Sequence, residues 1–178
     1  MKICVDPGHG GRDPGAVNDD LYEKDITLSI VKKLRNILRY WNYDTVITRA
    51  SDRFVSLNER VETAKINKAD ALVSVHANAV GNPDVTGIET YHWPMTSVGS
   101  DKLANCVQGK LIENMRRNDR GVKQARFKVL SVSGMPAILV EVGFISNPEK
   151  YKLFKEDYYN FMKAFSIAEG IELYEKEV

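Results

Sequence analysis

Neither sign of charge dominates this 178-residue sequence, in which 25 Lys and Arg residues stand against 24 Asp and Glu residues for a net charge of +1. No strong electrostatic field therefore selects nucleic acid or an anionic membrane as a partner. Long apolar runs are also missing, since none approaches the roughly 20 residues that span a bilayer. We therefore expect a protein that binds neither nucleic acid nor a membrane.

Cysteine is scarce, with Cys4 and Cys106 the two in the chain. Both lie in apolar patterns, so we expect buried free thiols made in a reducing compartment, although a single disulfide between them is an alternative. Neither lies in a polar loop beside a histidine, which argues against thiol catalysis. No charged segment followed by an apolar stretch opens the chain, so we expect synthesis in the cytoplasm without a signal peptide.

Apolar periodicity predicts strands that alternate with helices. Strands are predicted at residues 2–6, 44–48, 71–76, 87–93, 127–130 and 137–142. Helices are predicted at residues 23–41, 57–64 and 103–115, with two more helical stretches closing the chain. Ser56 is the expected N-cap of the second helix. The strand at 87–93 alternates apolar and polar residues, which is typical of an edge strand, and Phe161 and Phe165 are expected in the core.

This alternation implies βαβ units and a mostly parallel, twisted sheet with helices on both faces. No internal repeat, low-complexity tract or linker interrupts it. We therefore expect a single three-layer α/β domain over residues 1–178.

Four chemically capable side chains fall where such a sheet binds ligands, at the carboxyl ends of its strands. His9 follows the first strand by three residues, His76 closes the strand at 71–76, and Glu141 lies near the end of the strand at 137–142. Glu23 opens the helix that leaves the first loop. These residues are far apart in the chain, yet the topology brings them to one edge.

Two histidines and one carboxylate form a recurring catalytic zinc set that leaves a position for water. His9, Glu23 and His76 are the predicted ligands of one Zn²⁺ ion. Glu141 is the predicted general base, because a carboxylate in an apolar strand has a raised pKa and can accept and return a proton. The same donors accept other divalent ions.

Each ligand candidate also has a simpler interpretation. His76 fits a buried histidine bonded to a backbone carbonyl, and His9 fits a turn between glycines. Glu23 fits an acidic residue that favours the dipole of its helix. The convergence of all of them on one edge favours the metal site.

Glu141 could instead form an ion pair with Arg49 or Arg60. The glycine-rich loop could suggest a phosphate-binding turn, but Asp13 occupies the last glycine position of a GxGxxG pattern that starts at Gly8. Nucleotide binding is therefore not expected.

Six segments together resemble the zinc-dependent N-acetylmuramoyl-L-alanine amidases of the amidase-3 family, from residue 2 to about residue 173. They are VDPGHGGRDPGA, YEKDITL, SLNERVETAKINKADALVSVHANA, TGIETYHW, DRGVKQARFKVL and PAILVEVGFISNPEK. The resemblance assigns the metal to His9, Glu23 and His76, and the catalytic carboxylate to Glu141. It also implies a six-stranded sheet and a peptidoglycan substrate, cut between the lactyl group of N-acetylmuramic acid and L-alanine of the stem peptide.

The resemblance shapes the remaining expectations. We expect a monomer with no separate wall-binding domain that acts on the cell wall after release, as phage endolysins and autolysins do. Asn78 is a candidate substrate-binding residue, although an amide that caps its own loop is an equal alternative. His92 is expected to lie at the surface or contact substrate. Two alternatives remain, a zinc peptidase of carboxypeptidase type and a non-catalytic peptidoglycan-binding domain.

Overall fold

Strands and helices alternate along the chain in a computed structural model that describes residues 1–94, 99–132, 134–149 and 151–178. The strands are β1 (Lys2–Pro7), β2 (Val17–Asn18), β3 (Leu21–Tyr22), β4 (Asp44–Ile47), β5 (Ala71–Asn78), β6 (Ile88–His92), β7 (Asp119–Gln124) and β8 (Ala137–Phe144). The α-helices are α1 (Glu23–Tyr40), α2 (Leu57–Ile66), α3 (Ser100–Met115) and α4 (Asp157–Lys176). Two 3-10 helices, η1 (Lys128–Leu130) and η2 (Tyr151–Lys155), lie between them.

Six strands form one sheet in the order β4-β1-β5-β8-β6-β7. Hydrogen-bonded neighbours run parallel, except that β6 is antiparallel to β8. The predicted α/β domain with a mostly parallel six-stranded sheet is confirmed. Within the described part of the chain, no helix is both long enough and apolar enough to cross a membrane.

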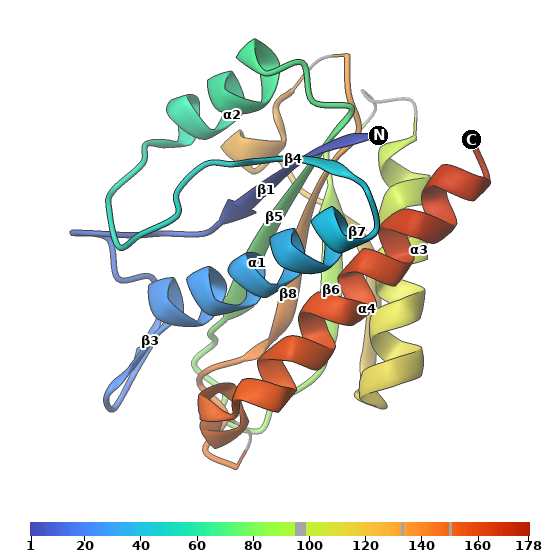
Figure 1. The fold of residues 1–178 in the computed structure, drawn as a ribbon. Helices are drawn as coiled ribbons and strands as arrows, with labels where there is room; N and C mark the ends of the chain where they lie inside the picture. The colour runs from blue at the N-terminus through green and yellow to red at the C-terminus, as the bar shows by residue number, and fades with distance from the viewer. Residues whose placement is uncertain (95–98, 133, 150) are drawn as a thin grey trace.

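Helices cover the two faces of this sheet unequally. Three helices, α1, α4 and α3, lie across one face (Figure 1) and pack with the sheet in one large apolar cluster. On the other face, α2 and η1 pack over Cys4, Leu72 and Leu139, which lie in the first half of their strands. The second half of that face carries polar side chains and is called here the open face. Helices on both faces are confirmed, and the open face is where a site can form.

Two small predictions are confirmed by local contacts. Ser56 caps α2 in a capping box, in which its hydroxyl accepts from the Glu59 amide and the Glu59 carboxylate accepts from the Ser56 amide. Cys4 and Cys106 are buried free thiols, and they belong to apolar clusters on opposite faces of the sheet.

The prediction that residues 87–93 form an edge strand is wrong. This segment is β6, which lies between β8 and β7. Its alternation arises because Ile88 and Thr90 face the α3 side, where Thr90 donates to Gln108, while Glu89 and Tyr91 stand on the open face. The edge strand next to β6 is β7, which the apolar pattern missed because its sequence DRGVKQ has a single apolar side chain, Val122.

Two apolar assignments are also corrected. Residues 127–130 form no strand, because Lys128–Leu130 is the 3-10 helix η1; a four-residue apolar run cannot separate the two by periodicity. On α4, Phe161 is exposed and stacks on Phe165, which in turn meets Trp41 edge to face. The buried face of α4 is instead formed by residues such as Ala164, Ile167, Ala168 and Ile171.

The buried face of α4 also contains a lysine. Lys163 is 0% exposed, and its Nζ has no hydrogen-bond partner within the described residues. The ammonium lies over the rings of Phe154 and Tyr159, at 3.5 and 4.2 Å from their centroids. Burial, together with the charge of Arg117, pushes the pKa of Lys163 well below its ordinary value.

Lys163→Met is therefore expected to stabilise the fold by about 1 kcal/mol near pH 7, because it removes a buried ammonium that has no hydrogen-bond partner within the described residues. The unfolded chain binds a proton on Lys163 that the folded chain tends to lose, so wild-type stability gains on the variant as pH rises towards 10.5. Urea unfolding near pH 7 and pH 10 should show the difference shrinking. A constant difference at both pH values would contradict this account, and Lys65→Met at an exposed site of α2 is the control.

Candidate metal centre

A row of polar side chains crosses the open face. His76 on β5 pairs in register with Glu141 on β8, and Glu141 pairs with Glu89 on β6. Residues that pair across neighbouring strands point to the same face of a sheet. One imidazole and two carboxylates thus lie side by side, one from each of the adjacent strands β5, β8 and β6.

His9 reaches this row from the loop that follows β1. The loop turns sharply, and His9 itself adopts a left-handed conformation with φ of 60°, which is uncommon for a residue with a side chain. Gly8 precedes it directly against His76, since a Cβ at residue 8 would lie 2.4 Å from His76 Cε1. The rings of His9 and His76 meet edge to face, with centroids 5.0 Å apart.

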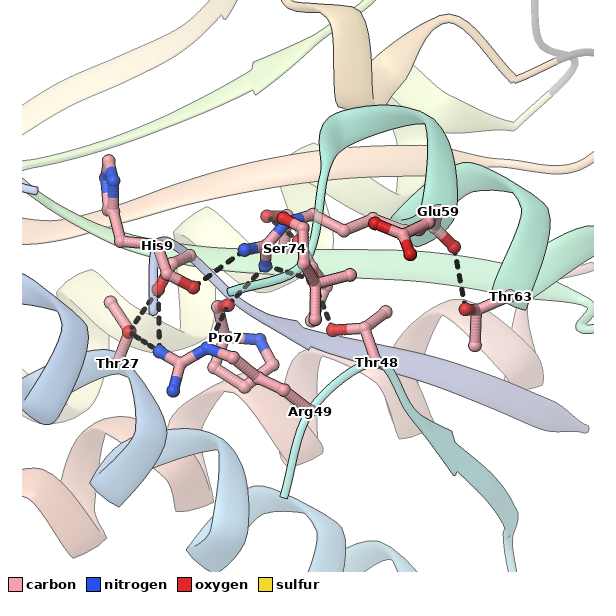
Figure 2. Close-up of polar contacts among 12 residues, drawn as sticks. Pro7, His9, Thr27, Thr48, Arg49, Glu59, Thr63 and Ser74 are labelled. Atoms are coloured by element: carbon pink, nitrogen blue, oxygen red, sulfur yellow. Dashed lines mark hydrogen bonds and ion pairs between the residues drawn. The ribbon is translucent and has the colours of Figure 1, made fainter. Parts of the chain in front are cut away.

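Two buried arginines hold the backbone of this loop. Arg49 donates through Nε to the carbonyl of Pro7 and through Nη2 to the carbonyl of Gly8, and Figure 2 shows it between the loop and Thr27 of α1, its further partner. Arg60 donates to the carbonyls of Pro7 and His9. Every carbonyl from residue 7 to residue 9 therefore has a charged donor.

Arg60 is itself held by a buried carboxylate. Asp6, 0% exposed at the end of β1, accepts from Arg60 Nη1 at 2.7 Å, from Thr48 at 2.5 Å and from Ser74 at 2.6 Å. A buried charge needs such a set of partners. Arg49 and Arg60 are thus engaged with the loop and with Asp6, and the predicted ion pair of either one with Glu141 is wrong.

Glu23, at the start of α1, joins the two histidines. Its Oε1 lies 3.1 Å from His9 Nε2 and 3.0 Å from His76 Nδ1, and it accepts from the amide of Ala77 at 3.0 Å. Its Oε2 accepts from the amide of Ala16. One ligand atom from each of His9, Glu23 and His76 lies within 4.8 Å of the other two. These three residues are called here the metal group.

The environment prepares the Glu23 carboxylate as an ionised ligand. Burial alone would raise its pKa, but hydrogen bonds with His76 and His9 outweigh burial and hold the pKa well below its usual range. Two imidazoles and one ionised carboxylate around a common centre match the donors that Zn²⁺ takes in catalytic sites. The residues therefore fit a metal ion, and the structure brings together all three that the sequence predicts.

Asp13 is a partner of the candidate site that the sequence did not point to. His9 Nδ1 donates to Asp13 Oδ2 at 2.9 Å, which directs the other ring nitrogen, Nε2, towards Glu23. Metal-binding histidines commonly donate their second N–H to a carboxylate, which fixes the tautomer and ring orientation. The available signal was an acidic residue four positions after His9 in the same turn-rich loop.

Glu141 stands beside the metal group without belonging to it. Its Oε2 is inaccessible to water and lacks a hydrogen-bond partner within the described residues. Burial, followed by the negative charges of Glu23 and Glu89, raises the pKa of Glu141 well above its ordinary value. A carboxyl group with a raised pKa is a better proton acceptor than an ordinary carboxylate, which suits a general base.

A cavity of about 270 Å³ opens next to the metal group, under α2 and η1. Phe54, Leu57 and Val129 provide its apolar walls, and His9 and His76 line its polar end. The cavity can hold an apolar or sugar-sized portion of a ligand beside the histidines.

Asn78 and His92, the two remaining candidate residues, lie outside the group of His9, Glu23 and His76. The amide of Asn78 donates to Glu89 Oε1 at 2.8 Å, so its nitrogen is engaged on the open face while its role towards substrate stays a prediction. His92 is half-buried, and its Nδ1 donates to the carbonyl of Trp93. Among the described residues, His92 is not one of the clustered candidate metal ligands.

Residues 3–173 match the family of N-acetylmuramoyl-L-alanine amidases, which is nearly the whole chain. The chain belongs to this amidase family. The crystal structure of N-acetylmuramoyl-L-alanine amidase from Clostridium difficile 630 superposes with a TM-score of 0.95 at 37% identity, over 98% of this chain and 96% of that one.

Two curated relatives of the chain are an amidase of a bacterium and an endolysin of a phage. N-acetylmuramoyl-L-alanine amidase LytC of Bacillus subtilis is 39% identical over 94% of this chain and 34% of LytC. The endolysin of Bacillus phage SPP1 is 40% identical over 95% of this chain and 64% of the endolysin. The chain thus spans less than two thirds of the length of each of these two proteins.

Gly8→Ala is expected to weaken metal binding about tenfold or more, because its Cβ would displace the His76 ring by contact at 2.4 Å. Metal content after dialysis against a graded chelator measures the effect. Gly109→Ala is the matched control, since a Cβ there meets nothing within 4 Å and alanine favours a helix by about 1 kcal/mol over glycine. Equal metal retention in both variants would show that the close approach is unimportant.

Asp13→Asn should lower metal affinity about 10- to 100-fold, since the amide cannot hold His9 as the carboxylate does. Competition with a fluorescent zinc chelator gives the affinity directly. Asp84→Asn, at an exposed position in another loop, should leave it unchanged. Unchanged affinity in Asp13→Asn would remove this carboxylate from the metal site.

Proposed function

We propose that this protein is a zinc-dependent N-acetylmuramoyl-L-alanine amidase of bacterial peptidoglycan. The substrate bond is the amide between the lactyl group of N-acetylmuramic acid and L-alanine of the stem peptide. The observation that carries the proposal is the convergence of His9, Glu23 and His76 on one centre, with Glu141 beside them, whose Oε2 has no partner among the described residues. Membership of the amidase family supports the choice of substrate.

His9, Glu23 and His76 would hold a single Zn²⁺ ion. A bound zinc ion brings the pKa of a water molecule to about 7 and polarises a carbonyl group. The carboxylate of Asp13 keeps His9 in the required tautomer, and the arginine-bound loop keeps it in place.

Glu141 would carry the proton through the reaction. As the general base it takes a proton from the attacking water, whose oxygen bonds to the carbonyl carbon. As the general acid it gives that proton to the amine nitrogen when the C–N bond breaks, so that alanine leaves as a free amine. Its raised pKa favours the first step, because it makes the carboxylate a better proton acceptor, and its place one strand from His76 brings it within reach of the same substrate atoms.

The products separate this proposal from a carboxypeptidase-type zinc peptidase and from a non-catalytic wall-binding domain. An amidase releases intact stem peptides from purified walls and leaves the glycan strands intact, whereas a carboxypeptidase releases terminal amino acids. A binding domain releases nothing. Mass spectrometry of the soluble digest distinguishes the three, and loss of activity with a chelator followed by recovery with Zn²⁺ tests the metal.

Glu141→Gln should reduce the release of stem peptides by about 10³-fold or more while leaving zinc bound, because the amide cannot accept the proton. The same variant should be more stable than the wild type before zinc is added, since it removes a carboxylate that faces the negative charges of Glu23 and Glu89 and whose Oε2 is buried without a partner among the described residues. Glu113→Gln, exposed on α3, is the control for both measurements.

The two readouts for Glu141→Gln are release of stem peptides from walls and thermal unfolding. Retained release of stem peptides would exclude Glu141 as the proton carrier. Loss of zinc together with activity would instead indicate a metal ligand.

A further inference from the structure

The polar row on the open face continues past Glu141 to the edge of the sheet. Glu89 on β6 is 2% exposed and accepts four hydrogen bonds. Asn78 and Tyr91 donate to its Oε1, each at 2.8 Å. From β7, Arg120 Nε and Lys123 Nζ donate to its Oε2 at 2.8 and 2.5 Å. A single carboxylate therefore holds two cations of the edge strand.

Glu89 leaves part of the hydrogen-bonding capacity of these two cations unused. It takes only the Nε of Arg120, and the two terminal nitrogens of that guanidinium have no partner within the described residues. The Arg120 side chain is 36% exposed and that of Lys123 is 38% exposed. The Arg120 guanidinium also lies over the Phe144 ring, 5.0 Å from its centroid. Held at one nitrogen and against one ring, it presents a fork that suits a carboxylate.

The position of Glu141 sets the direction in which a substrate would lie. The group that protonates the leaving nitrogen must be on the amine side of the scissile bond. Glu141 stands on β8, between His76 on β5 and the strands β6 and β7. The leaving peptide therefore extends over β6 towards β7, and the acyl portion extends towards the cavity beside His9. This step rests on the proposed function.

The spacing of the strands gives the length of peptide that reaches β7. Neighbouring strands lie about 4.8 Å apart, so two steps from β8 to β7 cover roughly 10 Å. Figure 1 shows β8, β6 and β7 as neighbours at this side of the sheet. An extended chain advances about 3.4 Å per residue, so the edge strand lies about three residues from the scissile nitrogen.

We propose that Arg120 and Lys123 bind a carboxylate of the leaving peptide, about three residues from the scissile bond, and that Glu89 positions them for it. The subsite selects peptides with a free carboxylate in that region over peptides in which it is amidated. A purely structural role, in which the two cations only neutralise Glu89, predicts no such selection.

The test compares two synthetic N-acetylmuramoyl tripeptides, one with free carboxylates and one with those carboxylates amidated. With the zinc-loaded wild type, kcat/KM should be about tenfold or more higher for the free acid, mainly through KM. Arg120→Gln should lose most of this preference, Lys123→Gln should lose part of it, and Arg120→Lys should keep part of it. Lys110→Gln, with an exposed ammonium on α3, is the control and should keep all of it.

Equal kcat/KM for the two substrates in the wild type, or an unchanged preference in Arg120→Gln, would overturn the subsite. Thermal unfolding of each variant identifies loss of fold, and the Lys123→Gln result then decides. Calorimetric binding of the two free tripeptides measures the preference without hydrolysis. If neither substrate is cleaved yet the acid binds better, the amidase proposal fails and the subsite stands; if both are cleaved equally, the reverse holds.

Discussion

Two buried guanidinium groups determine the shape of the loop on which the metal group depends. The carbonyls of residues 7 to 9 accept hydrogen bonds from Arg49 and Arg60, and the bonds to residues 7 and 8 are buried. Buried carbonyls without donors would destabilise this turn and release His9 from its left-handed conformation. The charge of Arg60 is balanced by Asp6. The buried Arg60–Asp6 ion pair therefore helps to fix the orientation of the His9 imidazole.

Two carboxylates on the open face are driven to opposite protonation behaviour by their partners. Glu23 is surrounded by donors and stays ionised, which suits a ligand. No described residue donates to the buried oxygen of Glu141, and Glu23 and Glu89 are its negative neighbours, which favours the protonated form. Burial raises the pKa of both, so hydrogen bonding decides which of the two suits a metal ligand and which suits a proton carrier.

The sequence was sufficient for the fold class and for the convergence of His9, Glu23 and His76, because parallel strands bring their ends to one edge. Apolar periodicity did not identify two elements correctly. The edge strand β7 is mostly polar, and η1 is too short to show a period. The partners of the site were also hidden. Nothing in spacing alone shows that Asp13 orients His9 or that Arg60 meets Asp6.

The edge strand β7 has one further consequence, for behaviour in concentrated solution. A strand with a neighbour on one side only can recruit a second chain through its free backbone groups, and natural proteins discourage this with charge and irregular backbone. Here the discouraging features are Arg120, Lys123 and the left-handed Gly121 between them. Exchanging these cations for apolar residues would therefore remove a barrier to the association of two chains through β7, whatever its effect on the site.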